Sequence, residues 1–126
     1  MNEPSLENLS IDQLVARHAA IGIEHDKAID MDNHAKFKRI IRRLFDEKTE
    51  IENELKRRPG DQRRSLMALY NHPNMQVRLN AAKATLAVAP EAARRVVEAI
   101  AETQYPQAGD AGMCLWALDK GIFVPK

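Results

Sequence analysis

The residues in this chain that most resemble metal ligands are two histidines, His18 and His25. They lie seven residues apart, and Glu24 and Asp26 flank the second one. Seven residues are about two helical turns, so both imidazoles would project from roughly one face of a helix. A zinc site needs tightly convergent ligands, typically two at i,i+3 or i,i+4 on one helix and others from elsewhere. We therefore interpret these side chains as surface histidines beside surface acids, and we predict no bound metal.

The single cysteine, Cys114, is the candidate thiol nucleophile. A catalytic thiol needs a lowered pKa and a nearby base. Cys114 instead falls between the expected core positions Ala111 and Leu115, and no glycine-rich oxyanion turn or partner histidine is evident. We expect a buried structural cysteine. A lone cysteine also excludes an internal disulfide framework and fits a reducing compartment.

Paired carboxylates and phosphate-binding loops give no better case for catalysis. Asp110 and Asp119 flank one expected helix, and we interpret them as a cap and a turn residue. No nucleophile and base pair, and no glycine loop that could cradle a phosphate, can be assembled from the motifs. The sequence predicts a protein that is not an enzyme and holds no cofactor.

Basic residues between positions 36 and 64 are the feature best suited to nucleic acid. They are Lys36, Lys38, Arg39, Arg42, Arg43, Lys56, Arg57, Arg58, Arg63 and Arg64. Acidic residues interrupt the stripe at Asp46, Glu47, Glu50, Glu52 and Glu54. The formal charge of the whole chain is only +1, too balanced for binding driven by counterion release. Solvated helix charge is the favoured interpretation, and a phosphate-binding face is the alternative.

Composition favours a small, helical, soluble protein. A length of 126 residues is close to the usual size of one domain, and 44% hydrophobic with only 5% aromatic residues suits closely packed helices. The N-terminal MNEPSLENLSIDQ lacks the basic and apolar regions of a signal peptide, and no apolar run approaches the roughly 18 residues of a membrane span. We expect one cytoplasmic, all-α domain over residues 1–126 with no membrane partner.

Apolar spacing and capping residues predict six helices. Ser10 and Gln13 form a capping box that starts the first helix, which continues to Ala28. The turn 30–33 precedes a second, long helix that ends before Pro59. Its apolar stripe comprises Phe37, Ile40, Ile41, Leu44, Ile51 and Leu55.

The second half contains four shorter predicted helices. Asp61 can cap the third, Asn74 the fourth, and Pro90 suits the first position of the fifth. The sixth runs from about Ala108 to Lys120 and stops at Gly121 in a left-handed conformation. The apolar tail 122–125 is expected to fold back on the last helices.

The segment from His72 to Leu86, HPNMQVRLNAAKATL, joins a Pro-Asn corner to a helix. The pattern resembles the second helix of a repeat of the HEAT and armadillo superfamily. The residues that carry this resemblance are Pro73, Val77, Arg78, Ala81, Ala82 and Leu86. The resemblance implies that the valine and the alanines let helices approach closely, and that the arginine bonds to the preceding repeat. Residues from about Glu54 to Pro125 also look like a small uncharacterised bacterial family of HEAT-like helical domains with no assigned function.

The repeat pattern departs from HEAT in the last third of the chain. Pro73 and Pro106 are 33 residues apart, shorter than the roughly 40 to 47 residues of a HEAT repeat. Stacked repeats need about three units for stability, so the N-terminal hairpin (residues 1–58) must form the first layer ahead of residues 61–126. We expect a compact HEAT-like α-α superhelix of about six helices in three antiparallel layers.

Helical-repeat domains usually work by presenting a surface, so we predict a non-enzymatic module that binds a protein partner. Gln76, Asn80 and Lys83 recur at helical spacing and form the expected exposed docking face. Met113 and Trp116 project from the sixth helix away from its core face. They are either a binding hot spot or a cover under which Ile122 and Phe123 pack, and packing is favoured.

The sequence leaves the partner, the process and the oligomeric state undefined. A regulatory pair and a toxin-immunity pair are two settings in which such a module would act. The alternative function is a nucleic-acid-binding or HEAT-like DNA-repair domain that uses the arginines of the second helix.

Overall fold

The computed structural model describes residues 5–126, and the described part contains five α-helices, two 3-10 helices and no strand. Residues 1–4, part of the N-terminal segment discussed above, lie outside the described residues. In chain order the elements are η1 (Leu6–Asn8), α1 (Ile11–Ala28), α2 (His34–Arg57), η2 (Gln62–Leu69), α3 (Met75–Thr85), α4 (Pro90–Ala101) and α5 (Ala108–Asp119). The predicted all-α fold is confirmed. No helix in residues 5–126 combines the length and the apolar character that crossing a membrane requires.

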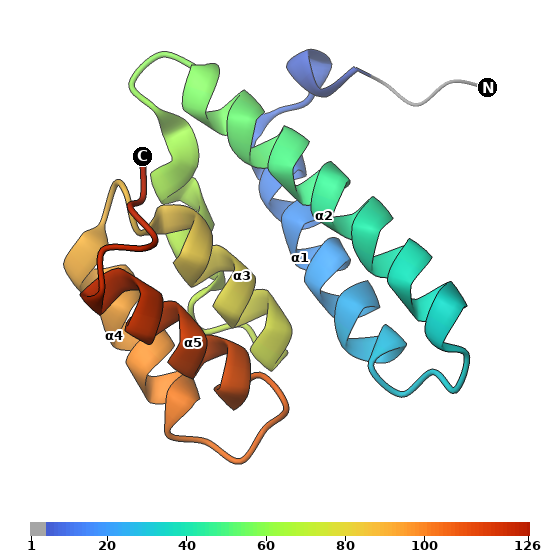
Figure 1. Cartoon of the computed structure of the whole chain (residues 1–126). Coiled ribbons are helices and arrows are strands. Elements are labelled where there is room, and N and C mark those ends of the chain that lie inside the picture. Colours follow the sequence, from blue (N-terminus) through green and yellow to red (C-terminus); the bar gives the residue numbers. More distant parts are fainter. Residues whose placement is uncertain (1–4) are drawn as a thin grey trace.

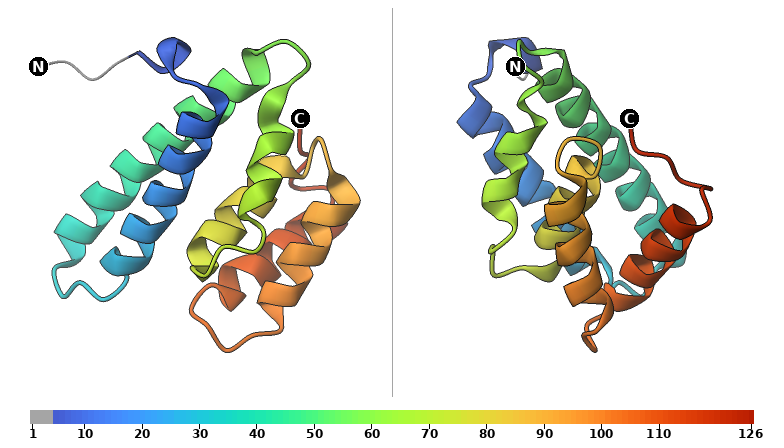
Figure 2. Two further views of the ribbon diagram at one scale, coloured as in Figure 1. Left: turned by 180° about the vertical axis from the view of Figure 1, so that it is seen from behind. Right: turned by 90° about the vertical axis from the view of Figure 1, so that its left-hand side faces the viewer.

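The helices form three pairs, α1 with α2, η2 with α3, and α4 with α5 (Figure 1). Helix α1 packs on α3, and α3 packs on α4, so each pair contacts mainly the next pair along the chain. The long hairpin α1–α2 therefore lies on one side of α3, and α4–α5 lies on the other (Figure 2). The predicted layered arrangement is confirmed.

The helix starts follow the predicted capping residues. Ser10 and Gln13 form a complete capping box at α1, and the Asn33 side chain accepts a hydrogen bond from the Lys36 amide at α2. The Asn74 side chain accepts from the Val77 amide at α3. Each side chain satisfies an amide that the first helical turn leaves without an internal partner, so local chemistry sets these boundaries.

The third predicted helix forms as the 3-10 helix η2. Asp61, at its start, has φ 51° and accepts a hydrogen bond from the Arg63 amide. A 3-10 helix rises about 2.0 Å per residue, against 1.5 Å in an α-helix, so η2 covers more length with the same number of residues. This rise helps a short segment connect the end of α2 to the corner before α3.

Helix α3 belongs to both hydrophobic cores. Val77 and Ala81 enter the cluster formed with α1, α2 and η2, whereas Ala82 and Leu86 enter the cluster formed with α4 and α5. All four side chains are buried, as the repeat pattern predicts. The small side chains allow neighbouring helices to pack close to α3 on two sides.

Arg78 is anchored through a main-chain carbonyl. Its Nε donates a hydrogen bond to the His72 carbonyl oxygen. That carbonyl belongs to the corner directly before α3, not to the preceding layer, so the expected partner was wrong in its location. The bond ties the first turn of α3 to the backbone that leads into it.

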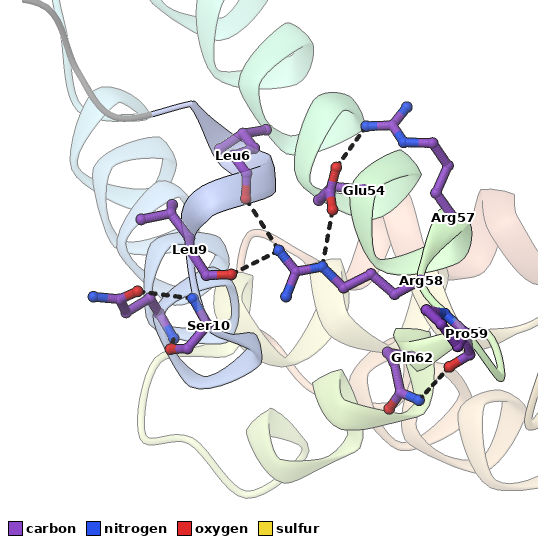
Figure 3. A network of polar contacts seen from close by, with 9 residues as sticks. Leu6, Leu9, Ser10, Glu54, Arg57, Arg58, Pro59 and Gln62 are labelled. Atoms are coloured by element: carbon purple, nitrogen blue, oxygen red, sulfur yellow. Dashed lines mark hydrogen bonds and ion pairs between the residues drawn. The ribbon is translucent and has the colours of Figure 1, made fainter.

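Arg58 joins the N-terminal segment to the end of α2 (Figure 3). Its Nη2 donates to the main-chain oxygens of Leu6 and Leu9 at 3.1 and 2.6 Å, and its Nε donates to Glu54 Oε2 at 2.8 Å. Arg57 Nη2 binds the other Glu54 oxygen at 2.7 Å. Hydrogen bonds from the two arginines hold the pKa of the buried Glu54 carboxyl below its usual value. These two members of the basic stripe have a structural role.

Candidate interaction surface

The predicted docking face on α3 is largely buried. Gln76 is 4% exposed and Asn80 is 2% exposed, so the expectation that they project into solvent is wrong. The Gln76 amide Nε2 donates to Asn80 Oδ1 at 2.9 Å. Lys83, the third member, is partly exposed and contacts Asp110 of α5 at 3.3 Å. Of these three residues, Lys83 connects α3 to another helix, whereas Gln76 and Asn80 bond to each other within α3.

His18 is also part of the interior, and its assignment to the surface was wrong. The side chain is fully buried, and its Nε2 lies 2.8 Å from Glu52 Oε2 on α2. Its Nδ1 has no hydrogen-bond partner within the described chain, and the same is true of Asn80 Nδ2. His18 thus links α1 to α2.

A lysine lies among these polar side chains without a paired carboxylate. Within residues 5–126, Lys48 on α2 forms no hydrogen bond or ion pair, and its Nζ lies 5.6 Å from the centroid of the Phe45 ring. Burial lowers the pKa of the Lys48 ammonium, and Glu52 partly offsets this effect. Burial also lowers the pKa of the His25 imidazole, and the positive charge of Lys48 adds to that decrease. The region around Lys48 and His25 is therefore charged and partly shielded from solvent.

Asp26 at the end of α1 connects all three helical pairs. Its carboxylate accepts a hydrogen bond from Asn74 Nδ2 at 3.2 Å and another from Gln107 Nε2 at 2.9 Å. Gln107 directly precedes α5 and is buried. Asp26 therefore ties the end of α1 to the segments that lead into α3 and α5. No group of three or more His, Cys, Asp or Glu residues suited to a metal ion occurs in residues 5–126.

Cys114 is buried on the core side of α5, as predicted. Burial raises the pKa of its thiol, which disfavours the thiolate that nucleophilic chemistry needs. Asp110 and Asp119, at opposite ends of the helix, pair with Lys83 and Arg94. The carboxylate of Asp110 makes no cap, because α5 has no side-chain hydrogen bond at its N-cap.

The outer face of α5 exposes its large apolar side chains. Met113 is 63% exposed and Trp116 is 50% exposed, one helical turn apart on the same face. Between Asp110 and Asp119 the helix carries no charged residue. An apolar helix face of this kind is normally covered by other protein.

The C-terminal tail leaves this face open. Gly121 has φ 70°, as predicted for a helix-ending glycine, and the Ile122 and Phe123 amides both bond to the Ala117 carbonyl. The Ile122 side chain is nevertheless 65% exposed. The favoured expectation that Ile122 packs under Met113 and Trp116 was therefore wrong. We define the exposed apolar surface as Met113, Trp116, Ile122, Phe123 and Val124.

The basic residues of α2 divide into two groups. Arg43 pairs with Glu24 and Glu47, and Arg57 pairs with Glu54. In residues 5–126, the exposed lysine and arginine side chains of α2 that form no hydrogen bond or ion pair lie in its first half: Lys36, Lys38, Arg39 and Arg42. The ten basic residues noted in the sequence thus form no continuous free stripe.

Lys48 was missed in the sequence and His18 was wrongly assigned to the surface, although the spacing marks both as buried. Lys48 shares the stripe of Leu44, Ile51 and Leu55 at i, i+4, i+7 and i+11, the pattern of a buried helix face. His18 follows Leu14 by four residues and precedes Gly22 by four, both of them buried. A polar residue within an apolar stripe is the signal that identifies each of them.

The comparisons with known proteins agree with this fold. No curated protein matches the chain. The crystal structure of the protein RPA1889 from Rhodopseudomonas palustris CGA009 is similar, with 48% sequence identity and a TM-score of 0.88, covering 98% of this chain and 100% of that one. A family model described as a domain of unknown function, DUF2019, matches residues 12–119. The chain therefore belongs to the DUF2019 family.

Proposed function

We propose that this protein is a non-enzymatic module that binds a protein partner through the exposed apolar surface on α5 and the tail. The observation that carries the proposal is the exposure of Met113 and Trp116 side by side on a helix with an uncharged middle. Tryptophan and methionine are enriched at protein interfaces, where burial of a large apolar side chain supplies much of the binding energy.

A HEAT-like architecture supports this proposal and is part of it. In stacked helical pairs each pair covers the apolar face of its neighbour, and the outer face of a terminal pair is normally polar. Here α5 packs on α4, and Met113 and Trp116 on its other side are exposed. Since that side is apolar, it resembles the faces that are buried between neighbouring helical pairs, and a bound partner would bury it in the same way. A cytoplasmic regulatory or toxin-immunity pair would provide such a partner.

Affinity capture with matched variants tests the proposal. Wild-type protein, Trp116→Ala and Phe45→Ala would be immobilised and exposed to lysate of the source cell, and bound proteins would be quantified by mass spectrometry. Phe45 is the control because it is an exposed aromatic residue, at 59% exposure, on α2. We expect a partner that Phe45→Ala retains and Trp116→Ala loses. Equal capture by all three proteins would place the interface elsewhere, and turnover of a substrate would contradict the non-enzyme proposal.

The alternative function is nucleic-acid binding by Lys36, Lys38, Arg39 and Arg42, because these exposed cations have no acidic partner in the described chain. A DNA-binding titration at several salt concentrations separates the two functions. Binding through about four phosphate contacts would lose affinity steeply with salt, with a log-log slope of about −3 to −4. The protein-binding proposal predicts no measurable DNA affinity.

A further inference from the structure

A second surface, separate from α5, has the features of a small-molecule site. A cleft of about 350 Å³ opens between α4 and the corner that joins η2 to α3. Its apolar walls come from Tyr70, Met75, Val96 and Ile100. Ligand pockets in proteins usually measure about 300 to 1,000 Å³, so this cleft suits a small molecule.

Two arginines give the cleft its charge. Arg78 Nε is bonded to the His72 carbonyl, which fixes the guanidinium, while its Nη1 and Nη2 form no hydrogen bond in the part of the chain that the structure describes. Arg95, the second arginine of the lining, is largely exposed and has only a long contact of 3.9 Å with Glu91. No aspartate or glutamate lines the cleft. The lining therefore carries two positive charges and no carboxylate.

The neighbouring helix ends reinforce this potential. Met75, in the lining, is the first residue of α3, and a helix N-terminus carries a partial positive charge. The C-terminal end of α4 also borders the cleft and would oppose an anion. There, however, the Ile100 carbonyl accepts hydrogen bonds from both the amide and the hydroxyl of Thr103. These bonds reduce the negative potential of the α4 end.

We propose that this cleft binds a small monocarboxylate with a short apolar chain. The two free Nη groups of a fixed guanidinium suit the paired oxygens of a carboxylate, and the apolar walls suit a hydrocarbon body. A bare anion would leave the walls uncovered, and an amine would be repelled by Arg78 and Arg95. The site is independent of the proposed protein interface, because no α5 residue lines it.

Titration of isotope-labelled protein with octanoate, followed by amide NMR shifts, tests the site. We expect saturable shifts at Met75, Val96 and Ile100. Octylammonium, with the same chain and the opposite charge, and acetate, with no apolar chain, should each bind at least about tenfold more weakly.

Two variants test the cleft without removing the hydrogen bond from Arg78 to the His72 carbonyl. Ala99 is an exposed residue that lines the cleft, so Ala99→Phe should fill the space and weaken octanoate binding about tenfold or more. Arg95→Glu should weaken it about threefold or more. The control Ala16→Phe makes the same change at an exposed position of α1 outside the cleft and should bind as the wild type does. The proposal is overturned if octanoate gives no saturable shifts, if octylammonium or acetate binds as tightly, or if either cleft variant keeps wild-type affinity.

Discussion

Gly22 of α1 lies directly against Val77 of α3. A Cβ atom added to Gly22 would approach Val77 Cγ2 to 2.8 Å and the Val77 Cα to 2.9 Å, closer than atoms can pack without displacement. The contact includes main-chain atoms, so a side-chain rotation alone cannot relieve it. Glycine at this position therefore sets the distance between the first and second helical pairs.

Replacing Gly22 with alanine should consequently destabilise the protein. Overpacking costs about 1 to 3 kcal/mol, and the better helix propensity of alanine returns about 1 kcal/mol, so we expect a net loss of up to about 2 kcal/mol in urea unfolding. Gly112 on α5 is the control, because an added Cβ would meet no atom within 4 Å. Gly112→Ala should stabilise by about 0.5 to 1 kcal/mol. If both variants were stabilised, α1 and α3 would have to lie further apart than the contact of Gly22 with Val77 indicates.

Ala81→Leu should cost about 1 to 3 kcal/mol, because Ala81 is fully buried where α3 packs on the first core. The exposed Ala99 provides the control, since Ala99→Leu should change stability by less than about 0.5 kcal/mol. Denaturant midpoints report both values. An unchanged midpoint for Ala81→Leu would show that this face of α3 can accommodate a larger side chain without overpacking.

Arg78→Lys should destabilise the fold although it keeps the charge. Lysine has no group equivalent to Nε, so the bond to the His72 carbonyl is lost, at a cost of about 1 kcal/mol. The same change at the exposed Arg95 should be neutral. Thermal unfolding of the two variants makes the comparison, and identical melting temperatures would contradict the structural role of Arg78.

Much of the fold follows from local sequence signals, as the caps at Ser10, Asn33 and Asn74 show. Each capping bond joins residues three apart, so its chemistry is visible without the tertiary structure. The buried alanines of α3 were predictable for a different reason, since the repeat pattern encodes helix contacts on both of its sides.

The candidate site was less predictable, because burial depends on which neighbours surround a helix. Gln76 and Asn80 have the spacing of a solvent face, yet α3 lies between two helical pairs and their side chains bond to each other. The tail is the converse case. Ile122 is apolar and was expected to pack, but main-chain bonds to Ala117 hold it with the side chain exposed.

The acid sensitivity of the fold should depend on Glu54. The Arg58 and Arg57 hydrogen bonds hold its pKa below the usual value of 4.5. A lowered carboxyl pKa stabilises the folded state above the unfolded pKa, and this stability is lost as the pH falls through the folded pKa. Urea midpoints measured between pH 5 and pH 3 should fall less steeply in Glu54→Gln than in the wild type. Asp61 and Asp119, whose pKa values are also lowered, are present in both proteins, and parallel slopes would contradict the role of Glu54.

Cys114 should react slowly with a thiol reagent in the folded protein. Its burial raises the pKa of the thiol and limits access, so the modification rate at neutral pH should be at least about tenfold lower than in denaturant. Equal rates in the folded and unfolded states would mean that the α4–α5 core opens readily.

The central claim, that the outer face of α5 binds the partner, can be tested through Trp116, the only tryptophan in the chain. Protein labelled with 5-fluorotryptophan gives a single fluorine NMR signal, which can be followed as the captured partner is added. We predict a new, saturating resonance whose midpoint matches the dissociation constant measured separately, because the half-exposed indole becomes buried. A complex that forms while the fluorine signal keeps its position and width would contradict the claim.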